Sequence, residues 1–336
     1  MRKTLTVLTM LALAASARAH EVGDLMAAAA KDFLNSLDDE KTEAATFELD
    51  DEERVNWHYI PIGRKGLAIK DMDPDQQLLA HGLLSTGLSH TGYLKAIQIM
   101  SLEHLLWELE NHAPKRDPED YHVWIFGKPD PKGTWGWRFE GHHLSLNFTM
   151  VKGELIAETP AFWASNPGVV KEGKRKGLRV LAGEEDLARE LVKSLSADQK
   201  KKAVIAEAAP KDILTKDLPK VGALEDKGIP YGELNEGQQK QLWALIDEYL
   251  NNHHPTLAAE ERKVVKAEID AVKFAWAGGF EFGEGHYYYV QGKTWILEYC
   301  NTQNEALHPH AAWRKFGDDF GRDMLREHLK QAHAGE

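Results

Sequence analysis

Apolar residues recur at spacings of three and four along residues 74–110, which predicts amphipathic helices. Gly82, Gly87 and Gly92 interrupt this run, so we expect two or three helices in it. Residues 116–160 then change to alternating apolar and polar positions broken by Pro and Gly, a pattern typical of antiparallel strands joined by turns. The first part of the chain therefore predicts helices followed by strands.

The same order of patterns returns later in the chain. Residues 235–272 have helical periodicity, and residues 273–301 again predict strands around turns. When WRFEGHHLSLNF is placed over YYVQGKTWILEY, Gly141 falls on Gly292. The repetition indicates a duplicated unit of helices followed by an antiparallel hairpin, and the alternative is chance similarity between amphipathic elements.

The internal repeats are expected in residues 74–160 and 235–315. No linker rich in Pro, Ser or Gly separates them. We therefore predict that residues 20–336 form a single compact domain of the α+β class.

Residues 1–19 have the pattern of a secretory signal peptide: a basic start, an apolar run, and small residues at Ala17 and Ala19. Cleavage is expected after one of these two alanines. The rest of the chain has no uninterrupted apolar stretch of roughly 18 residues, the length that a membrane span needs. We therefore expect an exported protein, periplasmic or extracellular, without a membrane span.

The charge of the chain narrows the expected partners. The sequence has 53 acidic residues against 41 basic ones, a net charge of −12. Because such a surface repels phosphate backbones, nucleic acid is excluded as a partner and a small-molecule substrate is retained. The single cysteine, Cys300, cannot form an internal disulfide, so the fold must rest on its apolar core.

Five segments spread over nearly the whole chain carry a resemblance to a known family; they are NWHYIPIGRKGLAIKDM, IFGKP…WGWRFEGHHLSLNFT, TPAFWASNP, GEEDLARELVKSL and LHPHAAWRKFGDDFGRDMLREHL. In these segments the chain resembles the secreted bacterial family catalogued as domain of unknown function 3500. One departure is Cys300, where the family pattern tends to place Asp. The resemblance implies export and a single domain, and it implies no chemistry.

Two adjacent histidines, His142 and His143, lie in residues 137–148, which otherwise have the pattern of a strand. Because side chains alternate between the faces of a strand, His143 shares a face with Ser145, and His142 shares the apolar face with Leu144. We therefore predict that His143 faces a cavity as a metal ligand and that His142 is a buried, hydrogen-bonded histidine. The alternative for His143 is a polar strand face exposed to water.

Other candidate ligands come from the second repeat. Glu298 lies beside a tyrosine-rich hairpin, where a buried carboxylate needs a cation or hydrogen-bond donors, so it is a candidate fourth ligand or general base. His308 and His310 flank Pro309, which keeps the segment extended and points both imidazoles the same way. With His143, these residues form a nitrogen and oxygen set suited to zinc, iron or copper. The alternatives are an ordinary ion pair for Glu298 and aromatic packing for the histidines.

Two arginines and one further histidine are candidates with clear alternatives. The planar guanidinium of Arg314 suits a substrate carboxylate or phosphate, although Asp318 and Asp319 are close enough in sequence to pair with it instead. Arg64 either anchors its turn or faces a cleft. If cleavage makes His20 the first residue, its amine and imidazole could chelate copper, as in the copper monooxygenases that cleave polysaccharides.

The sequence lacks the G-x-S-x-G, H-E-x-x-H and Walker motifs, so no common catalytic class is indicated. We predict a secreted metal-dependent enzyme, a hydrolase rather than an oxidase, that acts on a small or anionic substrate. In this prediction His143, His308 and His310 hold a divalent metal, Glu298 is the base or fourth ligand, and Arg314 holds an anionic group. The alternative is a periplasmic binding protein whose histidines sequester metal or satisfy a polar core.

Overall fold

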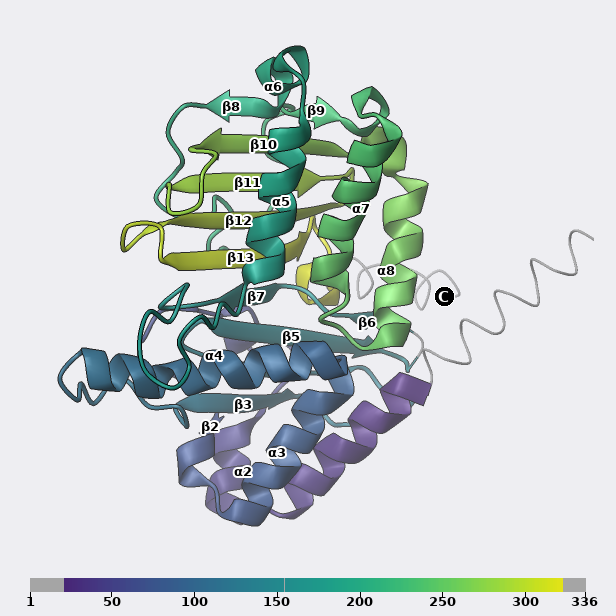
Figure 1. Ribbon diagram of the computed structural model, residues 1–336. Coiled ribbons are helices and arrows are strands. Elements are labelled where there is room, and N and C mark those ends of the chain that lie inside the picture. The colour runs from purple at the N-terminus through teal and green to yellow at the C-terminus, as the bar shows by residue number, and fades with distance from the viewer. Residues whose placement is uncertain (1–20, 154, 323–336) are drawn as a thin grey trace, which may run out of the picture.

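A computed structural model describes residues 21–153 and 155–322 (Figure 1). Its strands form one 13-stranded sheet with the order β1-β3-β4-β5-β7-β13-β12-β11-β10-β8, and β2, β6 and β9 pair with β3, β5 and β10. The strands are β1 (Thr46–Phe47), β2 (Leu67–Ala68), β3 (Tyr121–Phe126), β4 (Trp135–Gly141), β5 (Leu144–Val151), β6 (Leu155–Ala157), β7 (Ala161–Ala164), β8 (Val204–Ala206), β9 (Ile229–Pro230), β10 (Lys273–Gly278), β11 (His286–Gln291), β12 (Trp295–Gln303) and β13 (His308–Lys315).

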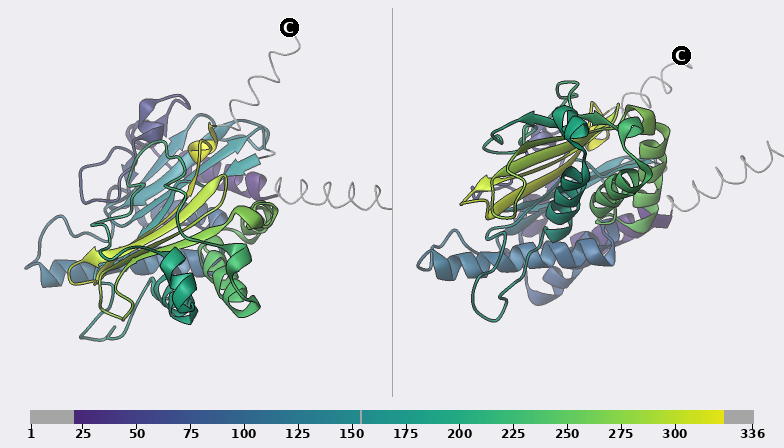
Figure 2. Two further views of the ribbon diagram at one scale, coloured as in Figure 1. Left: turned by 90° about the horizontal axis from the view of Figure 1, so that it is seen from above. Right: turned by 45° about the horizontal axis from the view of Figure 1, so that its top comes forward.

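Helices cover one face of this sheet, as the turned views also show (Figure 2). In Figure 1, α2, α3 and α4 lie over the half that contains β3, and α5, α7 and α8 lie over the half that contains β11. Residues 21–35 are also helical, and the named helices are α2 (Asp39–Ala45), α3 (Pro74–Gly87), α4 (His90–Leu109), α5 (Ala182–Ser194), α6 (Ala197–Ala203), α7 (Glu236–Leu250) and α8 (Pro255–Ala267). Short 3-10 helices are η1 (Glu52–Val55), η2 (Ile69–Asp71), η3 (Tyr231–Glu233), η4 (Ile269–Ala271) and η5 (Asp319–Gly321).

The helix starts follow from local sequence. Asp73 caps α3, with Gln76 completing a capping box, and Asn235 and Gln238 do the same for α7. Ser89 accepts a hydrogen bond from the backbone of Gly92 and begins α4, so the periodic run of residues 74–110 contains two helices. The predicted combination of helices and a large sheet in one compact domain is confirmed.

The sheet separates two apolar clusters. The larger one lies between the sheet and the helices and includes Leu102 and Leu245. The smaller one includes Trp57, Tyr59 and Ile213, which belong to irregular segments rather than to helices. The second face of the sheet is therefore covered by loops, and the candidate site lies on that face.

The strand order is the same from both edges of the sheet to its centre. From one edge, β1 pairs in parallel with β3, and antiparallel pairs then follow through β4, β5 and β7; from the other, β8 pairs in parallel with β10, and antiparallel pairs follow through β11, β12 and β13. Gly141 ends β4, and Gly292 directly follows β11. That the halves are copies of one unit stays a prediction.

Candidate metal centre

His142 and His143 form the turn between β4 and β5 rather than part of a strand. Gly141 pairs with Leu144 across the antiparallel ladder, which leaves two residues in the turn. His143 has φ of 67°, a conformation that usually favours glycine or asparagine. The alternation used to assign faces to these histidines was therefore wrong, because the pleat ends at Gly141.

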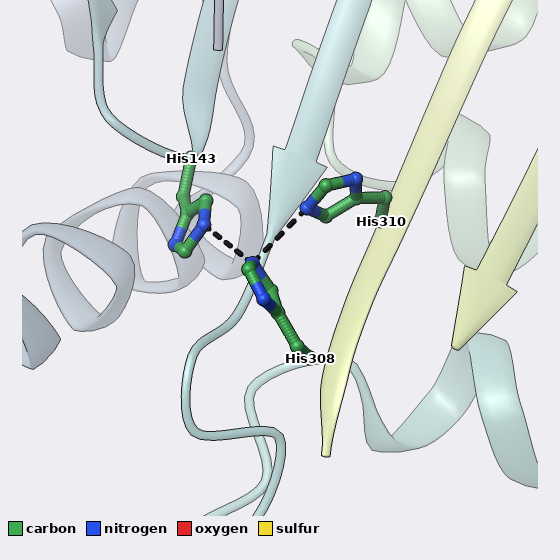
Figure 3. Close-up of side chains that lie close together, drawn as sticks. All are labelled: His143, His308 and His310. Carbon is green, nitrogen blue, oxygen red and sulfur yellow. Dashed lines mark hydrogen bonds between the residues drawn. The ribbon is translucent and has the colours of Figure 1, made fainter. Parts of the chain in front are cut away.

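The turn brings His143 close to two histidines of β13. His308 and His310 are two residues apart on this strand, so their side chains project from one face. The His308 Nε2 atom lies 2.8 Å from Nε2 of His143 and 3.1 Å from Nε2 of His310 (Figure 3). Strand β7 lies between β5, which follows the His142–His143 turn, and β13, which carries His308 and His310, and it pairs with both.

These three histidines form a group of the size that a metal ion requires. One ring nitrogen of each lies within 4.8 Å of those of the other two. Nitrogens that bind zinc tetrahedrally at about 2.0–2.1 Å lie roughly 3.3 Å from one another. The two nitrogen–nitrogen distances of His308 are close to this value.

Asp212 fixes the orientation of His310. Its Oδ1 atom lies 2.7 Å from Nδ1 of His310, and its Oδ2 atom accepts a hydrogen bond of 3.1 Å from the hydroxyl of Tyr59. Because an ionised carboxylate can only accept, Nδ1 of His310 carries a proton, and in the neutral ring this leaves the lone pair on Nε2. A carboxylate behind a histidine is the usual support of a metal ligand.

The backbone of His143 makes two hydrogen bonds. Its N–H donates to the carbonyl of Tyr59, and its own carbonyl accepts from the N–H of Ala164 in β7. Tyr59 therefore supports the group twice, through its carbonyl toward His143 and through its hydroxyl toward Asp212.

Burial keeps two of these imidazoles uncharged. Desolvation, with the nearby histidines adding to it, lowers the pKa of His143 well below its usual value and lowers the pKa of His308 to about 3. At neutral pH both rings are in the unprotonated form that binds a metal.

A second buried group adjoins the first. Glu103, His142 and His143 also lie within 4.8 Å of one another, and the rings of the two histidines have centroids 3.5 Å apart. However, Nδ1 of His142 is 2.9 Å from Nη1 of Arg116, which can only donate, and 2.6 Å from Oε1 of Glu103. Desolvation raises the pKa of Glu103 to about 8 and lowers that of His142 to about 2, so the His142 ring is neutral at neutral pH and the protonated form of Glu103 is favoured. The guanidinium already supplies a cation here, so the first group is the better metal site.

Glu298 does not join the histidines in either group of the described residues. Its fully buried carboxylate accepts from the N–H groups of Leu214 and Thr215 and, at 2.6 Å, from the hydroxyl of Tyr287. These donors satisfy the carboxylate without a cation. Glu298 therefore anchors the segment that follows Asp212.

Arg314 has a similar structural role. Its Nε donates to Asp319 at 2.8 Å, and its two terminal nitrogens donate to the carbonyls of Lys216 and Leu218. The side chain is fully buried, and its guanidinium lies 5.1 Å from the ring of Trp57. Pairing with Asp319 is thus the alternative that the structure contains, and each nitrogen of the fully buried guanidinium already donates to a protein acceptor.

Arg64 both anchors its loop and lines a cavity. Its guanidinium donates to Glu140 and to backbone carbonyls that include those of Ile60 and Gly141. The cavity has a volume of about 330 Å³, and its wall includes Arg64, Glu103 and His142. It therefore lies beside the second buried group. His20 lies outside the described residues.

Three of these residues were not singled out from the sequence. Tyr59 and Asp212 lie in irregular segments, and Glu103 lies in the middle of the apolar helix α4. A glutamate among apolar helical positions is a usable signal, since a buried carboxylate needs a partner. Nothing in the sequence around Asp212 distinguishes it from the other acidic residues.

Fold and site together define an α+β protein with a buried group of histidines close enough to hold a metal ion. The chain belongs to the family described as Protein of unknown function (DUF3500), whose model matches residues 19–322. No curated protein and no solved structure matches it. None of the helices in residues 21–153 and 155–322 is long and apolar enough to cross a membrane.

Proposed function

We propose that this protein is an exported metal-dependent enzyme, a hydrolase, whose metal is held by Nε2 of His143, His308 and His310. The observation that carries the proposal is the convergence of these three nitrogens, with His308 Nε2 at 2.8 and 3.1 Å from the other two. Neutral imidazoles suit zinc, iron or copper, and three histidines are a known zinc set that leaves one position for water.

The hydrogen-bonding pattern favours a cation at this point. His308 Nε2 faces two other Nε2 atoms, and it has at most one proton to donate. In its neutral form the His310 ring donates its Nδ1–H to Asp212 and presents a lone pair at Nε2, so the His308 Nε2 atom cannot be satisfied by both of its neighbours at once. A metal ion would coordinate the Nε2 lone pairs.

Catalysis is favoured over metal storage by the surroundings of the group. A structural site is closed by four protein ligands, whereas a catalytic site keeps a position open. Only three histidines form this group among the described residues, and Glu298 is committed to Leu214 and Tyr287. A bound metal would lower the pKa of a water molecule and so supply the nucleophile of a hydrolase. The carboxyl groups that line the adjoining cavity, those of Glu103, Asp117 and Asp120, are placed to contact a substrate there.

Export and duplication belong to the same proposal. The basic and apolar residues of segment 1–19 support export. The matching strand orders support two copies of one unit, whose innermost strands, β7 and β13, meet next to the histidines.

Elemental analysis of the purified protein tests the metal site. Wild type should contain close to one zinc, iron or copper ion per chain, and His308→Ala with His310→Ala should contain only traces while keeping the circular dichroism of wild type. The matched control is His90→Ala with His104→Ala, which removes two histidines from α4; His90 is exposed and the His104 side chain is 60% exposed. Wild type without metal after growth and dialysis with all three metals would refute the proposal.

A further inference from the structure

Strand β12 contains a β-bulge beside the strand that carries two of the histidines. The register of β12 against β13 shifts by one residue between Cys300 and Gln303. As a result, Asn301 and Thr302 of β12 lie opposite a single residue of β13, Pro309. Pro309 has no N–H group to donate to the ladder, so the regular pairing is interrupted on both strands. Bulges redirect side chains and are common beside functional sites.

The first bulged residue, Asn301, holds the backbone of a metal ligand. Its Oδ1 atom accepts a hydrogen bond of 3.0 Å from the backbone N–H of His308. Asn301 is only 2% exposed, so it is shielded from water. Removing this acceptor would leave a backbone N–H group without its partner, which is costly inside a protein. The side chain of Asn301 therefore fixes the backbone from which the His308 ring projects.

The second bulged residue, Thr302, holds the segment that supports the other histidine of β13. Its hydroxyl lies 3.0 Å from the carbonyl oxygen of Pro210 and 3.1 Å from that of Lys211, and both are acceptors. The next residue is Asp212, whose carboxylate orients His310. One bulge thus holds the backbone of one ligand and the support of another.

The turn that joins β12 to β13 is strained. Asn304, Glu305 and Ala306 all have positive φ, at 50°, 58° and 59°. Residues other than glycine adopt this conformation at a cost, and they do so mostly at single positions rather than in runs. Such a turn persists only where the surrounding structure holds it. The hydrogen bond between Asn301 and His308, which joins the two arms of the turn, is one of the contacts that do so.

We propose that Asn301 is a positioning residue of the metal centre, which keeps Nε2 of His308 within reach of the ion held by the other two histidines. His308 is the ligand whose placement matters most, because its Nε2 atom lies 2.8 and 3.1 Å from the other two Nε2 atoms (Figure 3). The inference rests on the proposed function for the metal, whereas the position of the His308 ring can be measured without one.

Three variants isolate this role. Asn301→Leu has a similar volume and lacks the acceptor, whereas Asn301→Asp keeps an oxygen that accepts from the same N–H group. The matched control is Asn147→Leu. Asn147 is also buried, at 4% exposure, but its side chain donates to the carbonyl of Pro160 and the hydroxyl of Ser145, neither of which is a ligand. If Asn301→Leu does not fold, Asn301→Ala and Asn147→Ala take the place of the two leucine variants, with the same expectations.

Zinc affinity and the spectrum of the cobalt-loaded protein test the proposal. Chelator competition should show that Asn301→Leu binds zinc about tenfold more weakly than wild type or worse, as expected when a partner behind a ligand is removed. Asn301→Asp and Asn147→Leu should stay within threefold of wild type. The visible cobalt spectrum reports the ligands around the ion, so it should change in Asn301→Leu and match wild type in the other two. Wild-type zinc affinity or an unchanged cobalt spectrum in Asn301→Leu, or equal losses of affinity in both leucine variants, would overturn the proposal.

Chemical modification keeps this inference separate from the proposed function. His308 is half-buried, and a ring released from its neighbours should react faster with diethyl pyrocarbonate. In the metal-free protein, peptide mass spectrometry should show His308 carbethoxylated at least threefold faster in Asn301→Leu than in wild type, and at the wild-type rate in Asn147→Leu. Wild type that binds no metal would refute the proposed function and leave this comparison intact. An unchanged rate in Asn301→Leu would then overturn the positioning role.

Discussion

Replacing Asp212 by Asn tests whether the carboxylate behind His310 supports a metal ligand. Oδ1 of Asp212 is 2.7 Å from Nδ1 of His310. Asparagine has nearly the same shape and can keep its oxygen toward His310, while its amide group can donate to the hydroxyl of Tyr59. The substitution therefore removes the negative charge and leaves the histidine tautomer unchanged.

The expected loss of zinc affinity follows from the removal of this negative charge. Removing such a supporting partner typically lowers metal affinity 10- to 100-fold, or about 1.4–2.8 kcal/mol. Zinc affinity is measured by competition with a chromophoric chelator, and the melting temperature of the metal-free protein is recorded beside it. Asp212→Asn should weaken zinc binding by this factor while the metal-free protein melts within a few degrees of wild type.

Asp217→Asn is the matched control. Asp217 lies in the same segment and pairs with His58 at 2.7 Å, but its side chain is 36% exposed and it does not contact the three histidines. Its zinc affinity should stay within twofold of wild type. The reasoning is refuted if Asp212→Asn binds zinc as tightly as wild type, or if both variants lose affinity equally.

Three further substitutions have defined outcomes. Glu298→Gln leaves one oxygen for three donors, so the free energy of unfolding should fall by about 1.5–3 kcal/mol in urea titrations, with a smaller loss of zinc affinity than Asp212→Asn causes. Gly141→Ala places a methyl group 2.4 Å from the Tyr121 ring, so the free energy of unfolding should fall by about 1–3 kcal/mol and zinc should bind more weakly. An unchanged free energy of unfolding and zinc affinity would show that the ring moves freely. His253 is buried, its ring nitrogens have no hydrogen-bond partner among the described residues, and burial, followed by the charge of Lys315, lowers its pKa to about 3. Its neutral form stabilises the fold above pH 6.5, and this contribution is lost as the pH falls toward 3, by up to roughly 1.4 kcal/mol per pH unit, so His253→Leu should flatten the acid limb of a stability–pH curve.

The sequence was informative where local pattern decides the structure. Three- and four-residue spacing predicted helices in residues 74–110, and Pro309 between His308 and His310 indicated the extended segment that became β13. The faces of His142 and His143 could not be obtained in the same way. A two-residue turn is usually predicted from a Gly or Asn at its position of positive φ. In this turn His143 occupies that position.

Tertiary partners account for the other differences. Glu298 and Arg314 have the residue types of a site, and both are buried beside it, yet both bind the segment that begins at Asp212. Their partners are mainly backbone groups of residues 214–218, which no side-chain pattern could identify. The sequence therefore singled out residues of one region, whereas separating Glu298 and Arg314 from the three neighbouring histidines required the three-dimensional contacts.

Three local costs coincide at the histidines. His143 has a positive φ that glycine or asparagine would adopt more readily, its imidazole is buried and that of His308 is half-buried, and Nε2 of His308 lies within hydrogen-bond distance of two other Nε2 atoms although it has at most one proton to donate. A turn selected for stability alone would avoid all three by carrying another residue at position 143. Sequences depart from local rules mainly where function requires it. A metal ion bound by the three Nε2 atoms would account for all three departures at once, whereas hydrogen bonds between the rings account for the burial and for only one of the two contacts of the His308 Nε2 atom by donation.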